Sequence, residues 1–222
     1  MARDTTIRYT LAGTLMCRTP LHIGGFGDDP DTDLPLARDG RGRCYVPGTS
    51  LAGALRQWCR RAFGNQPHDP ADPTDPVNRV WGYQNRNDST QGDASFVTVD
   101  DLYVSDEQLV PEVRDGVGMD RRSGAAAEAI KYDRAVLPRG TVLMGFTLTA
   151  DVKADNDGIA LAMFAGLLQE LEAGRIRLGA AKTRGLGKIT LANAKLRKVA
   201  TNTRKGIVQQ SLRLQHDPGD LP

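Results

Sequence analysis

The chain has 222 residues, 40% of them hydrophobic and 25% charged, which suits one elaborated globular domain with a buried core. No apolar run approaches the roughly 20 residues of a membrane helix, and the N-terminus lacks the apolar segment of a signal peptide, so we expect a cytoplasmic protein with no membrane partner. The net charge of +2 does not by itself indicate a nucleic-acid binder, but basic residues gather in clusters that can form a basic face, at residues 56–61, 121–122, 175–188 and 195–205.

The first third of the chain predicts strands and one helix. Residues 5–17 alternate apolar and polar positions, which is typical of a half-buried strand. Residues 44–46 predict a short strand, after which Thr49 or Ser50 caps a helix that ends at Gly64. The apolar residues of this helix share a helical spacing: Leu51, Leu55, Trp58, Cys59 and Ala62.

The rest of the chain predicts further strands, a second helix and one long insertion. Residues 65–76 are rich in Asp and Pro and predict a loop, and residues 95–104 predict a strand. Residues 110–138 are basic and irregular, which is typical of a functional excursion from a sheet. A strand at 141–152, a helix at 158–173, a strand-like run at 175–178, a final strand at 189–199 and a mobile tail at 201–222 complete the series.

This order of elements, β-α-β, an excursion, then β-α-β, predicts one domain over residues 1–200. The fold class is α+β, of the split βαβ, ferredoxin-like type with a long insertion. The sequence contains no convincing internal repeat.

A glycine-rich basic loop covers residues 179–188, between the last two strand-like runs. Gly179, Gly185 and Gly187 allow sharp turns and close backbone approach, and Lys182, Arg184 and Lys188 add positive charge. The spacing fits neither a P-loop nor a dinucleotide-binding fingerprint. Two interpretations stay open: a loop that binds phosphate oxygens, or a glycine-rich hairpin that only joins two strands.

The three cysteines are an odd set without a Cys-x-x-Cys pair, so we expect reduced thiols. A zinc site that uses Cys59 and His68 is conceivable, but no second ligand pair stands at a recognisable spacing. A buried or idle thiol is therefore the favoured interpretation.

Four blocks of sequence precede the glycine-rich loop in the order found in a known family: residues 21–25, 33–39, 45–56 and 117–124. Together with the loop at 179–188, they resemble the RAMP superfamily of CRISPR-associated proteins, in particular the repeated backbone subunit of type III (Csm/Cmr-like) effector complexes. The resemblance spans about residues 8–191, and its specificity lies in the ordered set, because each block alone is weak. One departure is Ala52, where family members commonly have a lysine that contacts phosphate.

The resemblance implies a modified RNA-recognition-motif-like fold in which residues 110–138 form a thumb hairpin. Copies of the chain would stack along a guide CRISPR RNA with other effector subunits, and each thumb would wedge between bases. Complementary target RNA would be cut near each wedge, with Mg²⁺ or another divalent cation and no organic cofactor. The chain would then be a metal-dependent endoribonuclease.

The resemblance assigns catalysis and metal binding to Asp33 of the acidic loop at residues 26–35. Its neighbours Asp28, Asp29 and Asp31 are more simply a solvated acidic loop. Binding of guide RNA is expected from a dispersed set: His22, Arg56, Met119, Arg121, Arg122, Gly179, Lys182, Arg184, Gly185, Gly187 and Lys188. Bland alternatives stay open for several of these, since a lone His is more often a structural hydrogen-bonding residue and Met near a hairpin tip is as often packed.

Because aromatic residues are only 5% of the chain, RNA would be held mostly by its sugar–phosphate backbone, in a salt-sensitive way. Two other functions stay open. The chain is either a structural RNA-binding subunit without catalysis, or a stand-alone nuclease that processes guide precursor with His22 as acid or base.

Overall fold

The computed structural model describes residues 5–25, 32–67, 69–85, 88, 90–106, 108–200 and 208–210. A seven-stranded antiparallel sheet forms its centre, in the order β11-β10-β1-β9-β6-β2, with β5 also paired to β9. Three strands are long: β1 (Ile7–Cys17), β9 (Val142–Val152) and β10 (Ile189–Ala200). The other four are short: β2 (Tyr45–Val46), β5 (Val97–Val99), β6 (Leu102–Val104) and β11 (Val208–Gln210).

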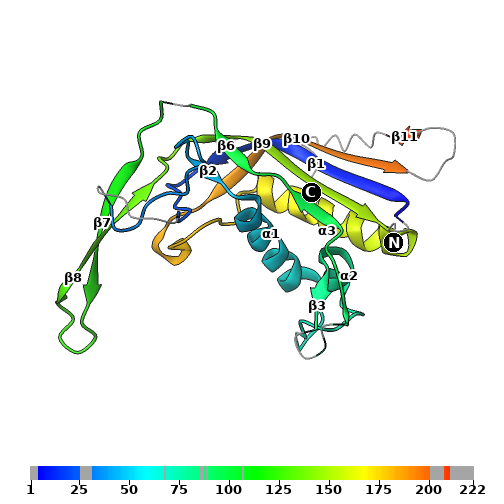
Figure 1. Cartoon of the computed structure of the whole chain (residues 1–222), viewed down its shortest axis with the longest axis horizontal. Coiled ribbons are helices and arrows are strands. Elements are labelled where there is room, and N and C mark those ends of the chain that lie inside the picture. Colours follow the sequence, from blue (N-terminus) through cyan, green and yellow to red (C-terminus); the bar gives the residue numbers. More distant parts are fainter. Residues whose placement is uncertain are drawn as a thin grey trace, which may run out of the picture.

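Two long helices, α1 (Gly48–Phe63) and α3 (Asp157–Glu172), lie on the same side of this sheet (Figure 1). Leu51, Leu55 and Cys59 of α1 are fully buried and recur every four residues, so they face the sheet along one stripe. The buried residues of α3 are Ala160, Met163, Phe164, Leu167 and Leu171. The predicted mixed α and β chain with antiparallel strands is therefore confirmed.

Several predicted boundaries are wrong in detail. The run at 175–178 is no strand, because only a single bridge joins Arg177 to Lys188. The strand predicted at 95–104 is divided into β5 and β6. Neither Thr49 nor Ser50 caps α1: the carboxylate of Asp101 accepts from the Gly48 amide at 2.6 Å. A tertiary carboxylate has thus replaced the local cap that the sequence indicated.

The acidic stretch before residue 76 is a series of turns, as predicted, but a short helix follows it. This helix, α2 (Pro76–Trp81), begins where Asp75 accepts hydrogen bonds from Val77 and Asn78 at 2.8 and 3.0 Å. A small hairpin of β3 (Tyr83–Gln84) and β4 (Gly92–Asp93) comes next. The Asp-Pro pair at 75–76 was a usable helix-start signal.

The predicted excursion is an antiparallel hairpin of β7 (Glu112–Met119) and β8 (Ala126–Val136), which forms a separate two-stranded sheet. It projects from the body and carries its tip far from the helices (Figure 1). Gly116 and Gly118 leave room for side chains of β8: a Cβ on Gly116 would collide with Tyr132, and one on Gly118 with Ile130.

The cysteines are free thiols, as expected. Burial raises the pKa of both Cys17 and Cys59 to about 12, so neither is a reactive thiolate. His68, the other ligand considered for zinc, lies outside the described residues. So does most of the tail predicted at 201–222, although its described part, β11, pairs with β10. Among the described helices, none is long and apolar enough to cross a membrane.

A partly buried polar cluster ties the start of α3 to the sheet. The hydroxyl of Tyr9, a fully buried residue, donates a very short hydrogen bond to Asp157 Oδ1, and Lys198 Nζ lies 2.7 Å from Asp157 Oδ2. Burial acts to raise the pKa of Asp157, but the hydrogen bonds from Lys198 and Tyr9 and the charge of Lys198 outweigh it, so the pKa lies below its ordinary value.

This cluster predicts acid-dependent stability. A carboxylate with a depressed folded-state pKa stabilises the fold above its unfolded pKa of about 3.9 and loses that contribution as pH falls through the folded pKa. We expect Asp157→Asn to lower the free energy of unfolding by about 1 kcal/mol at pH 7 and by less near pH 3, in urea titrations. Asp155→Asn is the control, because its side chain is 68% exposed in a surface ion pair. An equal loss at both pH values would contradict this assignment.

Candidate nucleic-acid interface

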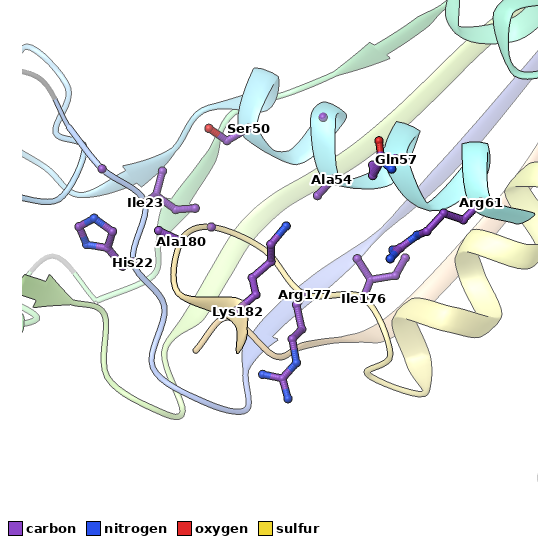
Figure 2. A pocket seen from close by; sticks show the side chains of 13 residues that line it. His22, Ile23, Ser50, Ala54, Gln57, Arg61, Ile176, Arg177, Ala180 and Lys182 are labelled. Carbon is purple, nitrogen blue, oxygen red and sulfur yellow. The ribbon is translucent and has the colours of Figure 1, made fainter. Parts of the chain in front are cut away.

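A groove of about 610 Å³ separates α1 from the glycine-rich loop. One wall is a face of α1 that recurs at helical spacing, formed by Ser50, Gly53, Ala54, Gln57 and Arg61. The opposite wall comes from Ile176, Arg177, Gly179, Ala180 and Lys182, and the end is closed by His22, Ile23 and Gly24. Figure 2 shows these walls facing one another across the groove. The two walls, about 120 residues apart in the chain, thus form one elongated concave surface.

The groove is positively charged. Arg61 extends into it from α1 and Lys182 from the loop, while the Arg177 side chain turns away and donates to the Leu186 carbonyl at 2.9 Å (Figure 2). Within the described part of the chain, no carboxylate forms an ion pair with any of these three residues. Their charges are therefore available to a polyanion such as a nucleic-acid backbone.

The glycines of the loop are required by close backbone contacts. A Cβ on Gly179 would meet the His22 carbonyl, and one on Gly187 would meet the Leu178 carbonyl, both at impossibly short distances. Both residues also have positive φ, of 77° and 81°. The sequence predicted this close approach, but the object approached is the protein's own backbone.

Between these glycines, a short 3-10 turn, η2 (Lys182–Arg184), exposes all of its side chains. Ala181 precedes it at φ 53°, a left-handed conformation that sequence reasoning did not assign to an alanine. Gly185 follows at φ 90° with open space around it. The turn presents Lys182 to the groove, but Arg184 points toward the hairpin and donates to the Tyr132 hydroxyl at 2.5 Å.

Lys188 lies apart from the groove lining. Its amide donates to the Thr19 hydroxyl at 2.9 Å, and its carbonyl accepts from the Arg18 amide at 2.8 Å. The backbone of Lys188 thus fastens the end of the loop to the end of β1, and its contact with RNA stays a prediction.

His22 is buried, with 4% of its surface exposed. Its Nδ1 lies 2.7 Å from the carbonyl oxygen of Ala135 in β8, and since a carbonyl only accepts, Nδ1 carries the proton. Burial lowers the pKa of His22, and the charge of Arg134 lowers it further against the opposing effect of that hydrogen bond. The imidazole is therefore neutral at pH 7, and its geometry is that of a structural hydrogen-bonding residue at the end of the groove.

Arg56 does not line the groove. It is half-buried beside α2, where Nη2 donates to the Gly82 carbonyl at 2.5 Å. Burial and the neighbouring Arg60 lower its pKa, with Asp75 acting in the opposite direction. Arg56 is therefore not part of a freely solvated helix face, and its contact with phosphate stays a prediction.

Three predicted RNA-binding residues lie on the β7–β8 hairpin and not in the groove. Met119 ends β7 with 63% of its surface exposed, and Val117 is 54% exposed. Arg121 and Arg122 lie exposed in the turn at the tip, where the Asp120 carboxylate accepts from the Arg122 amide at 2.6 Å. The structure therefore forms two surfaces, the groove and the hairpin, where the sequence suggested one set of residues.

Asp33 lies exposed at the base of the hairpin and is held there by Asp133 of β8. The Asp33 amide donates to Asp133 Oδ1 at 2.8 Å, and the Asp133 amide donates to Asp33 Oδ2 at 3.0 Å. Asp28, Asp29 and Asp31 lie outside the described residues. Among the residues that the structure describes, no group of three or more His, Cys, Asp or Glu side chains is arranged to hold a metal ion.

Sequence reasoning missed Ser50, Gln57, Arg61, Ile176 and Arg177 of the groove and Asp133 beside Asp33. The α1 residues were detectable, because Ser50, Ala54, Gln57 and Arg61 recur every three or four positions and are smaller or more polar than the opposite stripe. Asp133 had no local signal, since it lies 100 positions from Asp33.

The family model described as the RAMP superfamily matches residues 14–190 of the chain. The CRISPR system Cms endoribonuclease Csm3 of Methanothermobacter thermautotrophicus is 25% identical over 213 residues, which cover 85% of each protein. The family match begins in β1 and ends in β10, so it includes the groove, the hairpin and Asp33.

The loop contacts predict unequal effects of alanine at two glycines. Gly187→Ala combines left-handed strain with a collision against the Leu178 carbonyl, so it should lower the free energy of unfolding by more than about 2 kcal/mol. Gly185→Ala, at a similar φ but with open space, should lower it by about 1 kcal/mol. Chemical denaturation of both variants measures the difference. Equal losses would mean that Leu178 does not approach Gly187 in solution.

Proposed function

Because the chain belongs to the RAMP superfamily, we propose that it is a guide-RNA-binding backbone subunit of a type III CRISPR effector complex. In this proposal it also cleaves complementary target RNA at regular intervals in a metal-dependent way. The similarity to a protein named CRISPR system Cms endoribonuclease Csm3 supports both parts. The single observation that carries the proposal is the positively charged groove between α1 and the glycine-rich loop, inside the matched region.

The fold supports this function through its strand order. Strands β10, β1 and β9 are neighbours in the sheet, and β5 and β6 pair with β9. Of the two long helices, α1 follows β2 and α3 follows β9. We take this arrangement as the modified ferredoxin-like, RNA-recognition-motif-like fold of the family. The β7–β8 hairpin then has the role of the thumb, with Val117 and Met119 as its exposed apolar wedge.

The groove suits a single RNA strand. Arg61 and Lys182 supply cations on opposite walls, and Gly179 and Ala180 add little side-chain bulk to the wall between them. Such a surface contacts phosphates and riboses more than base edges, so it holds any guide sequence. The chain has few aromatic residues, which agrees with binding that does not depend on base stacking.

Asp33 suits the role of catalytic residue because its carboxylate is exposed and held in place. Its Oδ2 accepts from the Asp133 amide, and no hydrogen bond joins its Oδ1 to any residue that the structure describes. Mg²⁺ is commonly held by one or two carboxylates together with substrate phosphates and several waters, so Asp33 and the target phosphate would hold such a cation with water as its remaining ligands. When bound, such a cation stabilises the charge that develops on the phosphate. Asp33 would position the scissile linkage at the base of the thumb.

Binding is tested at the two cations of the groove. Lys182→Ala and Arg61→Ala should each weaken binding of single-stranded guide RNA and reduce the slope of log K against log salt by about 0.7, since each removes one phosphate contact. Lys195→Ala is the matched control, because Lys195 is exposed on β10, outside the groove lining. Fluorescence anisotropy at several salt concentrations measures both quantities. Affinities equal to that of Lys195→Ala would remove the groove as the binding site.

Cleavage is tested at Asp33 in the assembled complex. Asp33→Ala should abolish cutting of complementary RNA in Mg²⁺, with guide binding and assembly retained, because the carboxylate lies outside the groove. Cleavage by the wild type should give fragments at regular spacing and stop in EDTA. Asp115→Ala, another exposed carboxylate near the hairpin base, is the control. Intact target RNA with the wild type would instead identify a non-catalytic structural subunit.

Processing of guide precursor by His22 is the remaining alternative. The hydrogen bond from Nδ1 to Ala135 and the burial of the ring favour a structural role for this histidine. Loss of precursor processing in His22→Ala, with folding retained, would support the alternative.

A further inference from the structure

The geometry points to Asp133 as the residue that positions Asp33 for cleavage, an inference that rests on the function proposed above. Each aspartate accepts a hydrogen bond from the amide of the other, at 2.8 and 3.0 Å. Such a reciprocal pair fixes both the backbone and the carboxylate of Asp33, because the amide and Oδ2 are held by the same partner. Asp133 acts through Asp33 and is a positioning residue.

The attachment continues along both segments. Leu34 bridges Arg134 in parallel, and the Ala135 amide donates to the Leu34 carbonyl at 3.1 Å. The segment that carries Asp33 is therefore joined to the base of β8 by an isolated parallel bridge. The two hydrogen bonds between Asp33 and Asp133, one to the Asp133 side chain and one from its backbone amide, lie one residue before this bridge.

The same stretch of β8 is also joined to the guide-binding side. Tyr132 accepts a hydrogen bond from Arg184 of the basic loop at 2.5 Å, and the Ala135 carbonyl accepts from His22 at 2.7 Å. Successive side chains of a strand point to opposite faces, so Tyr132 and Asp133 reach in opposite directions. The base of β8 thereby sets the distance between the loop that holds the guide and the carboxylate that cuts its complement.

The hairpin provides a matched control for Asp133. Asp115 stands directly opposite Asp133 in the ladder, so both side chains lie on the same face of the ribbon. Asp115 is 68% exposed and lies 3.5 Å from Lys131, and it has no bond to Asp33. Removing either side chain changes the charge of this face equally, but only Asp133→Ala removes a hydrogen bond to Asp33, the one that its backbone amide donates to Asp133 Oδ1.

Single-turnover cleavage by the assembled, guide-loaded complex tests the inference. Asp133→Ala keeps the amide that donates to Asp33 Oδ2 but frees the Asp33 backbone, which loses its bond to Asp133 Oδ1. It should slow cleavage roughly 10-fold, with target affinity unchanged, because small displacements of a reacting group cost that much. Asp133→Asn keeps an oxygen that accepts from the Asp33 amide and should cleave within about 3-fold of wild type, as should Asp115→Ala. Hydrogen exchange at the amides of Asp33 and Leu34 should become faster in Asp133→Ala only.

The outcomes separate this inference from the proposed function. If Asp33→Ala abolishes cleavage but Asp133→Ala behaves as Asp115→Ala, Asp133 does not position Asp33 and only the inference fails. If Asp133→Asn is as slow as Asp133→Ala, the charge of Asp133 is needed and the positioning role is overturned. If Asp33→Ala cleaves like the wild type, the proposed function fails, whatever the exchange data show.

Discussion

The backbone of residues 20–25 is the constraint on which the proposed site depends. Its carbonyl groups accept hydrogen bonds from two loops: Pro20 from Gly187, His22 from Ala180, and Ile23 from Ala37. On the hairpin side, Leu21 exchanges two backbone bonds with Leu137. One short segment after β1 therefore fixes the basic loop, the segment that follows Asp33 and the base of the hairpin relative to one another. Leu21, His22 and Ile23 are buried, so leaving their backbone groups unpaired would be costly.

The chain binds a polyanion, in our proposal, with almost no excess of positive charge. This is possible because its carboxylates and cations are used in different places. Several acidic side chains accept hydrogen bonds within turns, as Asp39, Asp72 and Asp120 do. These hydrogen bonds, from nearby amides and side chains, hold the pKa values of the three carboxyl groups below their ordinary value. By contrast, no carboxylate among the described residues forms an ion pair with Arg61, Arg177 or Lys182 of the groove. The local field, and not the sum over the chain, then decides what binds.

The sequence predicted the elements with strong periodicity and missed contacts between distant segments. The alternation in β1 and the stripe of α1 were readable because burial on one side imposes a period of two or 3.6 residues. The cap of α1 by Asp101 and the pairing of Asp33 with Asp133 were not, because each joins residues 53 or 100 positions apart. For the same reason the basic character of Lys182 was visible, while the orientation of Arg184 toward Tyr132 was not. Local chemistry can be read from a sequence, but the choice among several partners is made by tertiary packing.

The ribbon formed by β7 and β8 has a practical consequence. Val113, Val117, Met119 and Ile130 are each more than half exposed, and a two-stranded ribbon has no interior in which to hide them. Water-facing apolar side chains on an open strand pair favour association with other hydrophobic surfaces and self-aggregation. Production of the chain together with the molecules that cover this ribbon is therefore the preparation most compatible with a well-behaved sample.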